Sequence, residues 1–320
     1  MTVFVTGAGG FLGTHVVAEL LDRGQKVRAL LRPASGPEPH AWGGRAQVVR
    51  ADLRARLDAD ALDGIGTVVH LAATVRGTPE VQFAGTVVAT ERLIEGLRRT
   101  SSVRRIVLAS SFSVYDWGCA GGVLDEDTAL EPLPFERDGY TLAKLWQERV
   151  VRRAALENGW SLAVLRPGFI YGPGGAVAAG AGMALGRAFI VIGPRTRLPM
   201  TQVRNCARAF ADAALSGAEG TFNIIDDEPI SAWRYAGALR SAGIARCRLP
   251  VPYALGLGVA HLASFVSRIL FPPSGGKLPG ILVPRRYRAR FRPLRFANAR
   301  AKEGLGWRCD TQFSAASAVP

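Results

Sequence analysis

The first half of the chain alternates short apolar runs with longer stretches in which apolar residues recur every three or four positions. The runs predict buried strands, because parallel strands that are covered on both faces are apolar almost throughout. They cover residues 2–6, 26–31, 46–51, 67–72, 105–110 and 161–166. The periodic stretches predict amphipathic helices over residues 11–23, 83–99 and 141–158. This alternation indicates parallel βαβ units wound into an open sheet.

The pattern changes after Tyr171, where a Gly-Pro-Gly-Gly cluster begins and Gly, Pro and Arg become frequent. Residues 203–215 and 220–225 still have the apolar pattern of elements that pack on a sheet. We therefore expect an α/β protein with a doubly wound parallel (Rossmann) sheet and a smaller interleaved C-terminal substrate domain. The first domain comprises residues 1–170 with 201–226 returning to it, and the second comprises residues 171–200 and 227–320.

A glycine-rich loop separates the first predicted strand from the first predicted helix. Its glycines, Gly7, Gly10 and Gly13, allow a tight turn, close approach of a pyrophosphate and close packing of helix on strand. The spacing is Gly-x-x-Gly-x-x-Gly, and a purely structural turn is the alternative. Its position favours a dinucleotide whose phosphates lie at the helix N-terminus, where Phe11 and Leu12 follow.

The end of the second predicted strand bears on which dinucleotide binds. A carboxylate there binds the ribose 2′-hydroxyl, whereas an arginine accommodates a 2′-phosphate. Here Leu31 occupies the acid position and Arg32 follows, which favours NADP, with NAD as the alternative if Arg32 is only a solvated side chain. The ends of the third and fourth strands are expected to contribute further cofactor contacts through Asp52, Leu53, Leu71, Ala72 and Ala73.

Tyr140 and Lys144 lie one helical turn apart on the same face of the third predicted helix. Lys144 is one of only four lysines in the chain, so chance pairing is uncommon. A phenol with its ordinary pKa of about 10 is a weak base at neutral pH. We expect the ammonium to stabilise the phenolate, lower the pKa of Tyr140 and prepare it for acid/base catalysis.

These features resemble the extended short-chain dehydrogenase/reductase family, also called the NAD-dependent epimerase/dehydratase family. The resemblance rests on the glycine loop, Val68–Ala73, Ser110-Ser111 with Val114-Tyr115, Tyr140–Lys144, Leu165–Gly168, Tyr171–Gly174 and Leu305–Trp307. It implies that Ser111 hydrogen-bonds the substrate oxygen and that Tyr140 transfers the proton. It also implies that Lys144 supports Tyr140 and binds the ribose, and that Pro167 belongs to the cofactor site.

Two departures from the family's patterns narrow the expected reaction. Ser111-Phe112-Ser113 stands where sugar-nucleotide dehydratases carry Thr-Asp-Glu, so dehydration is not expected. Phe169 stands where nucleotide-sugar epimerases place an asparagine, and Arg166-Pro167-Gly168 is similar to the branch with flavanone and hydroxysteroid reductases. We expect an NADP-preferring oxidoreductase acting on a ketone or secondary alcohol of a rather apolar small molecule. The alternatives are a nucleotide-sugar epimerase and a non-catalytic dinucleotide-sensing or scaffold protein.

Charge and cysteine usage limit the partners. The formal net charge is +14, and residues 277–308 hold ten basic residues and one acid, but no nucleic-acid module or regular aromatic interleaving accompanies them. We therefore expect no nucleic-acid partner. The four cysteines and four histidines have no metal-ligand spacing, and His70 is expected to be a hydrogen-bonded core histidine. The N-terminus lacks a secretion-signal pattern, so we expect a cytoplasmic protein.

Residues 249–267 carry no formally charged side chain, which raises the question of membrane contact. Within and just after this stretch, Leu255, Val259, Leu262, Val266 and Ile269 follow helical spacing. We expect a packed helix of the substrate domain. The first alternative is an interfacial helix of a membrane-peripheral protein, because five arginines follow between residues 285 and 292, and the second is a membrane span.

The helices predicted over residues 83–99 and 141–158 are expected to form a homodimer. In similar proteins these two helices pair with their symmetry mates in a four-helix interface. Trp146 and Val150 lie one turn apart and are the expected contact residues. The alternative is that both helices pack only within one subunit.

Overall fold

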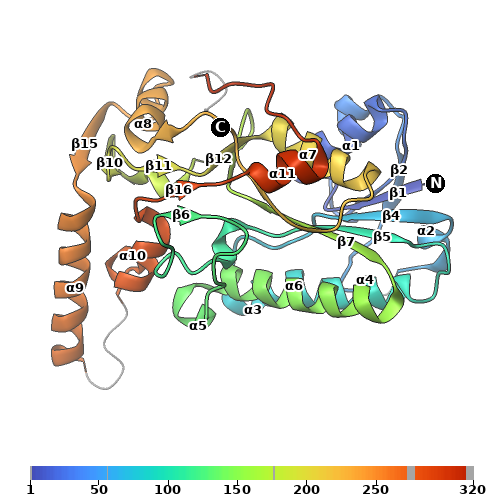
Figure 1. Cartoon of the computed structure of the whole chain (residues 1–320), viewed down its shortest axis with the longest axis horizontal. Helices are drawn as coiled ribbons and strands as arrows, with labels where there is room; N and C mark the ends of the chain where they lie inside the picture. Colours follow the sequence, from blue (N-terminus) through green and yellow to red (C-terminus); the bar gives the residue numbers. More distant parts are fainter. Residues whose placement is uncertain (1, 56, 176, 272–277, 315–320) are drawn as a thin grey trace.

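The computed structural model describes residues 2–314 except 56, 176 and 272–277 (Figure 1). Lys277, part of the basic stretch, and residues 315–320 of the predicted substrate domain lie outside the described residues. The described part consists of one large sheet between two helical layers, with a smaller group of strands and helices at one end.

Seven parallel strands form the large sheet in the order β13-β7-β5-β4-β1-β2-β3. They are β1 (Thr2–Thr6), β2 (Lys26–Leu31), β3 (Gln47–Arg50), β4 (Ile65–His70), β5 (Arg105–Ala109), β7 (Ser161–Pro167) and β13 (Gly220–Ile224). The predicted doubly wound sheet is confirmed, with strand ends shifted by at most two residues. The strand order reverses between β1 and β4, and in open α/β sheets ligands bind in the crevice at this point.

Helices cover both faces of the sheet (Figure 1). One core lies under α1 (Phe11–Asp22) and α7 (Val203–Leu215). The opposite core lies under α2 (Ala59–Leu62), α4 (Ala89–Leu97) and α6 (Gly139–Asn158). Strand β5 is buried along its whole length, as a central parallel strand between two helical layers should be.

The helix predicted over residues 83–99 differs in its start and in its geometry. It begins as α3 (Pro79–Phe83), continues through a π-helical turn (Ala84–Val88) and ends as α4. Pro79 occupies the first turn of α3, where proline fits because that N–H has no partner within a helix. At Gly85, inside the π turn, a Cβ would lie 2.0 Å from Thr74 Oγ1, so only glycine lets the turn approach the strand-end loop.

The smaller group of strands and helices is formed mainly by the chain from Phe169 onward. Strand β8 (Phe169–Tyr171) pairs with β12 (Met200–Gln202), and a second sheet has the order β15-β10-β9. Its members are β9 (Gly182–Leu185), β10 (Ala188–Ile192) and β15 (Cys247–Val251). The accompanying helices are α8 (Ala232–Ser241), α9 (Tyr253–Leu270) and α10 (Pro284–Phe291). Short elements complete this end: α5 (Pro134–Arg137) and the pairs β6 (Val123–Leu124) with β16 (Arg295–Phe296) and β11 (Arg197–Leu198) with β14 (Ile230–Ser231).

The C-terminal part of the predicted substrate domain returns to the large sheet. Helix α11 (Ala299–Leu305) packs on α7 and β13, and Trp307 is fully buried in the core beneath α1 and α7. The Trp307 indole N–H donates to the Asn205 carbonyl at 2.8 Å. Helix α11 and Trp307, which fall in the range predicted for the second domain, thus cover the β13 edge of the large sheet.

Candidate active site

The glycine loop has the geometry of a phosphate cradle. Gly7 has a φ of +66°, and a Cβ there would lie 2.8 Å from the Ala72 nitrogen. At Gly13 a Cβ would lie 2.1 Å from the Gly7 carbonyl oxygen. Gly10 precedes α1 without a side-chain cap, so the first N–H groups of that helix, from Phe11 and Leu12 onward, remain free to bind an anion.

A cavity of about 550 Å³ extends from this loop along the carboxyl ends of the strands. Its walls include eight of the predicted cofactor residues: Gly7, Gly10, Arg32, Asp52, Leu53, Leu71, Ala72 and Ala73. Phe11, Leu12 and Gly13 begin α1 behind the loop, and Pro167 is buried at the end of β7, outside the residues that line this cavity. The sequence analysis missed Gly9, Ser35, Arg54, Thr74 and Val81, which also line it.

Two arginines and one carboxylate form the end of the cavity beyond β2. Arg54 Nη2 lies 2.6 Å from Asp52 Oδ2, and Arg54 Nε also donates to this carboxylate. These hydrogen bonds lower the pKa of Asp52, with a smaller contribution from the charge of Arg32. Arg54 directly follows Asp52-Leu53, so extending the strand-end segment by one residue would have found it. Paired with Arg54, Asp52 leaves the Arg32 guanidinium available to a ligand.

These walls fit a nicotinamide dinucleotide. The glycine cradle and the free N–H groups of α1 suit a pyrophosphate, because the helix N-terminus carries partial positive charge. The apolar walls formed by Leu53, Leu71, Ala72 and Ala73 suit the flat adenosine portion of such a molecule. The residues present therefore match the cofactor type that the sequence analysis predicted.

Tyr140 and Lys144 lie in the first two turns of α6. Asp138 caps this helix, since its Oδ1 accepts the Thr141 N–H at 2.7 Å. Lys144 Nζ donates to the Ala109 carbonyl at 2.7 Å and to Gln147 Oε1 at 2.8 Å, and lies 5.9 Å from the centre of the Tyr140 ring. The Ser111 hydroxyl, just after β5, lies near enough to the Tyr140 phenol to oppose the rise of its pKa. The structure thus brings the three predicted catalytic residues together.

Burial determines the pKa values of the phenol and the ammonium. It raises the pKa of Tyr140 to about 12, with Asp138 adding to the rise and the Ser111 hydroxyl opposing it. It lowers the pKa of Lys144 to about 7, against the attraction of Glu148. The expected lowering of the pKa of Tyr140 is therefore wrong for this structure, because desolvation dominates and Lys144 donates elsewhere. A neutral phenol is a proton donor, which suits protonation of a carbonyl oxygen.

Beneath Lys144 lies a buried hydrogen-bonded layer that includes His70. His70 Nδ1 lies 2.6 Å from Thr6 Oγ1, and His70 Nε2 lies 2.8 Å from Thr90 Oγ1. The Thr90 hydroxyl also donates to the Thr86 carbonyl at 2.6 Å, and the Gln147 amide nitrogen lies 3.2 Å from His70 Nε2. Burial lowers the pKa of His70 to about 3, with the charge of Lys144 contributing. The prediction of a hydrogen-bonded core histidine is confirmed.

Gln147 connects Lys144 to this layer as a positioning residue. Its oxygen accepts from Lys144, while its Nε2 donates to Thr90 Oγ1 at 2.9 Å and to the Ala72 carbonyl at 3.2 Å. Gln147 is fully buried, and its position one turn after Lys144 was a signal that the sequence analysis did not use. Through these contacts it links the Lys144 ammonium to the strand-end segment at Ala72 that lines the cavity.

Replacing Gln147 with methionine is expected to move the alkaline limb of the kcat/KM profile to lower pH. The pKa of Lys144 is already about 7, and loss of an oxygen acceptor destabilises its charged form further. A hydrogen bond to a charged group contributes about 1.5–3 kcal/mol, so the rate at about pH 8 should fall roughly tenfold. Gln147→Glu is the matched control and should move the limb to higher pH. Unchanged profiles in both folded variants would contradict the positioning role.

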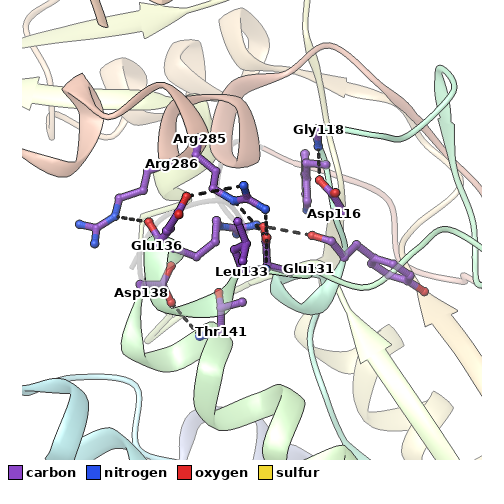
Figure 2. Close-up of polar contacts among 12 residues, drawn as sticks. Asp116, Gly118, Glu131, Leu133, Glu136, Asp138, Thr141, Arg285 and Arg286 are labelled. Carbon is purple, nitrogen blue, oxygen red and sulfur yellow. Dashed lines mark hydrogen bonds and ion pairs between the residues drawn. The ribbon is translucent and has the colours of Figure 1, made fainter. Parts of the chain in front are cut away.

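A buried ion-pair cluster joins α10 to the segment just before Tyr140 (Figure 2). Glu131, which is 2% exposed, accepts from Arg137 Nη1 at 3.1 Å and also from Arg285 of α10. Arg285 additionally lies 3.6 Å from Glu136 on α5. Desolvated pairs of this kind are costly to break, so they hold α10 over the N-terminal end of α6.

Arg290 of α10, one of the five arginines between residues 285 and 292, is a further basic residue near this end. Its side chain is exposed, yet the surrounding protein lowers its pKa by desolvation, with the Asp138 carboxylate opposing and Arg137 adding to the shift. Asp138 is two residues from Tyr140, so the Arg290 guanidinium lies near the N-terminal end of α6, which carries Tyr140.

Comparison with known proteins identifies the family. Residues 3–224 match the model of the NAD-dependent epimerase/dehydratase family, which is well over half of the chain. The protein belongs to this family. The predicted family membership is confirmed.

Relatives within the family are dehydrogenases and epimerases. The 3β-hydroxysteroid-dehydrogenase/decarboxylase isoform 1 of Arabidopsis thaliana is 28% identical, covering 95% of this chain and 75% of its own. A 3β-hydroxysteroid dehydrogenase/Δ5→4-isomerase of Mycobacterium tuberculosis is 32% identical over 73% of this chain and 67% of its own. The solved structure of MoeE5 in complex with UDP-glucose and NAD is 26% identical, with a TM-score of 0.68 over 98% of this chain and 95% of its own.

This family member is an NAD-binding oxidoreductase with a Rossmann fold. Its relatives are enzymes by name, so the alternative of a non-catalytic scaffold is set aside. Its cavity beside the glycine loop is the counterpart of a dinucleotide site in this fold class.

Proposed function

We propose that this family member transfers hydride between NADP(H) and a ketone or secondary alcohol, with Ser111, Tyr140 and Lys144 as catalytic residues. The observation that carries the proposal is the convergence of the three side chains at the end of β5. There the Ser111 hydroxyl lies beside the half-buried Tyr140 phenol, and the Lys144 ammonium lies 5.9 Å from the ring of that phenol. This combination supplies a hydrogen-bond donor and a proton donor for one substrate oxygen.

Each residue has one role in the proposed reaction. Ser111 binds the substrate oxygen, and the Tyr140 phenol donates its proton to that oxygen as the carbonyl becomes an alcohol. Lys144, held by Ala109 and Gln147, stabilises the phenolate that remains. The nicotinamide, when bound, supplies the hydride that reduces the carbonyl carbon. The opposite direction uses the same groups in reverse.

Two observations support a rather apolar substrate. Phe169 is half-buried against the core of the smaller group of elements and offers no hydrogen bond, where sugar-nucleotide enzymes would need a polar group. The relatives that match over most of the chain are named for hydroxysteroids and sterols. We therefore infer that the substrate carries its alcohol or ketone on a largely hydrocarbon skeleton.

The alternative is a nucleotide-sugar epimerase, which the likeness to MoeE5 with UDP-glucose favours. The test measures NADPH oxidation with 3-ketosteroids and NADP⁺ reduction with 3β-hydroxysteroids, in parallel with epimerisation of UDP-glucose. Mass spectrometry of the native protein should also identify any co-purifying small molecule. Turnover of the sugar nucleotide alone would overturn the proposal in favour of the epimerase.

We also propose a homodimer through α3, α4 and α6. These helices pack side by side, and Trp146 on α6 is 41% exposed beneath the Arg149 guanidinium. Val150, the other expected contact residue, packs instead against the sheet core.

Trp146→Glu is expected to shift the protein from dimer to monomer, because an unpaired carboxylate would be buried in the interface. Light scattering at micromolar concentration should report about twice the chain mass for the wild type. Leu156→Glu, an 86% exposed position near the end of the same helix, is the control and should leave the dimer intact. A wild type that remains monomeric refutes the interface.

A further inference from the structure

Helix α9 stands at one edge of the molecule (Figure 1). Among its residues only Ala260 and Ser267 are buried. It is long and apolar enough to cross a membrane by length and composition. The helix packs on α10 along one side, as expected of a helix of the substrate domain, but its other side is left uncovered.

The exposed side of α9 is an apolar stripe. At about 100° per residue its members fall within an arc of about 140°. They are 41–64% exposed and comprise Leu255, Val259, Leu262, Phe265, Val266, Ile269 and Leu270. Single exposed apolar residues are ordinary, but a contiguous stripe on one helix marks an interaction surface.

The opposite side of α9 is held to the protein by polar contacts. Ser264 Oγ donates to the Leu282 carbonyl at 3.1 Å, and the Tyr287 hydroxyl donates to the Tyr253 carbonyl at 3.1 Å. His261 Nε2 lies 3.2 Å from an Arg288 nitrogen. The helix is thus fixed along its length, with its apolar stripe directed away from the molecule.

Positive charge surrounds this stripe. Residues 229–302 contain fourteen arginines and lysines and no aspartate or glutamate, which accounts for the whole formal net charge of +14. Arg285 is paired with Glu131, but Arg268, Arg286 and Arg288 are exposed and make no ion pair with a described carboxylate. The rest of the sequence is electrically balanced, so the excess charge belongs to the part of the chain that contains α9.

We propose that the α9 stripe, with Arg268, Arg286 and Arg288, docks on an anionic phospholipid bilayer. The helix lies in the plane of the interface, with its apolar side chains in the acyl boundary and the guanidiniums at the headgroups. The polar contacts between α9 and α10 exclude a membrane-spanning position of α9. In such a position His261 and Arg288 would lie in the hydrocarbon region of the bilayer. A second copy is a poorer occupant, because pairing through this face would bring two clusters of unpaired arginines together.

A wide cavity of about 1190 Å³ opens beside the same surface. Its lining includes Phe265 and Arg268 from α9, Arg288 from α10, and Glu131 and Glu136 from the segment before Tyr140. An apolar molecule dissolved in the bilayer would meet the protein at this cavity. The docking surface is independent of the proposed reaction, since none of its residues belongs to the Ser111, Tyr140 and Lys144 group.

Sedimentation with vesicles tests the proposal on the full chain. Phosphatidylcholine vesicles containing phosphatidylglycerol should bind the wild type at least about tenfold more tightly than phosphatidylcholine alone, and added salt should weaken this binding. The double variant Leu262→Glu/Phe265→Glu should lose binding to both vesicles, without a folding defect because both side chains are 63% exposed. Arg286→Ser/Arg288→Ser should reduce only the preference for phosphatidylglycerol. Leu156→Glu, on α6, is the control and should bind like the wild type.

Three results would overturn the proposal. The first is a wild type that does not sediment with phosphatidylglycerol vesicles at physiological salt, and the second is a Leu262→Glu/Phe265→Glu variant that still does. The third is equal binding to both vesicle types, which would show that the arginines do not bind the anionic headgroups. Light scattering on the same variants tests whether a second copy of the chain covers the stripe instead. A wild type that does not bind vesicles, together with a Leu262→Glu/Phe265→Glu variant of half the wild-type mass, would assign the stripe to a second copy.

Discussion

Replacing Tyr140 by phenylalanine is expected to lower kcat by about 10²- to 10⁴-fold while leaving the dissociation constant for NADPH within a few-fold. The substitution removes one hydroxyl that donates the proton in the proposed reaction, but it leaves the ring and the hydrogen bonds of Lys144 in place. Stopped-flow reduction of the ketone measures the hydride step, and fluorescence titration measures NADPH binding. A loss in turnover without a loss in binding is the signature of an interaction made at the reacting atoms.

A matched control comes from Tyr235, another buried phenol. Its hydroxyl accepts the Ala178 N–H at 2.8 Å in the smaller group of elements, away from Ser111 and Lys144. Tyr235→Phe should lower the unfolding midpoint but change kcat by no more than a few-fold. Wild-type turnover in Tyr140→Phe would contradict the assignment, whereas equal losses in both variants would indicate a general packing defect.

The large sheet could be predicted from the sequence because its central strands are largely buried between two helical layers. Strand β1 has an apolar centre and β2 ends in an apolar run, and the predicted ends of both strands match the structure. Helix α3 was placed four residues late, since apolar periodicity begins near Phe83 whereas the helix starts at Pro79. The π turn could not be predicted, because it depends on how closely Gly85 approaches Thr74 in three dimensions.

Residue types and spacing predicted which side chains meet at the candidate site, but not their protonation. The one-turn separation of Tyr140 and Lys144 places them on one face of α6. Their pKa values depend on burial and on the partners of Lys144, namely the Ala109 carbonyl on β5 and Gln147. A strand end distant in sequence supplies one of these partners, so the sequence alone could not reveal that desolvation outweighs the attraction between the pair.

The sequence alone could not predict what covers the apolar side of α9. Helical spacing identified a stripe containing Leu255 and Leu262. An apolar stripe has the same sequence pattern whether other parts of the protein or a lipid bilayer cover it. The structure decides this point, because contacts with Leu282, Tyr287 and Arg288 occupy only the opposite side of the helix.

The second large effect is expected at Arg32. Replacing it with aspartate should weaken NADPH binding by about 10²-fold or more and reverse the preference between NADPH and NADH. Truncating one partner of a close charge pair costs about 2–5 kcal/mol, and a carboxylate adds repulsion of the 2′-phosphate. Arg54 does not compensate, because its guanidinium is held by Asp52 at 2.6 Å. The same carboxylate can accept a hydrogen bond from the 2′-hydroxyl of NADH, so NADH affinity should not fall.

Two further variants separate local recognition of the 2′-phosphate from the general field of a basic protein. Arg32→Ser removes the charge without adding repulsion, so it should weaken NADPH binding without improving NADH binding. Arg240→Asp makes the same change in net charge at an exposed position on α8 and should leave both affinities unchanged. Calorimetric titration of the wild type and the three variants with NADPH and with NADH gives the dissociation constants for this comparison. Equal affinities for NADPH and NADH in both the wild type and Arg32→Asp would show that Arg32 is a solvated charge and that the site does not read the 2′-phosphate.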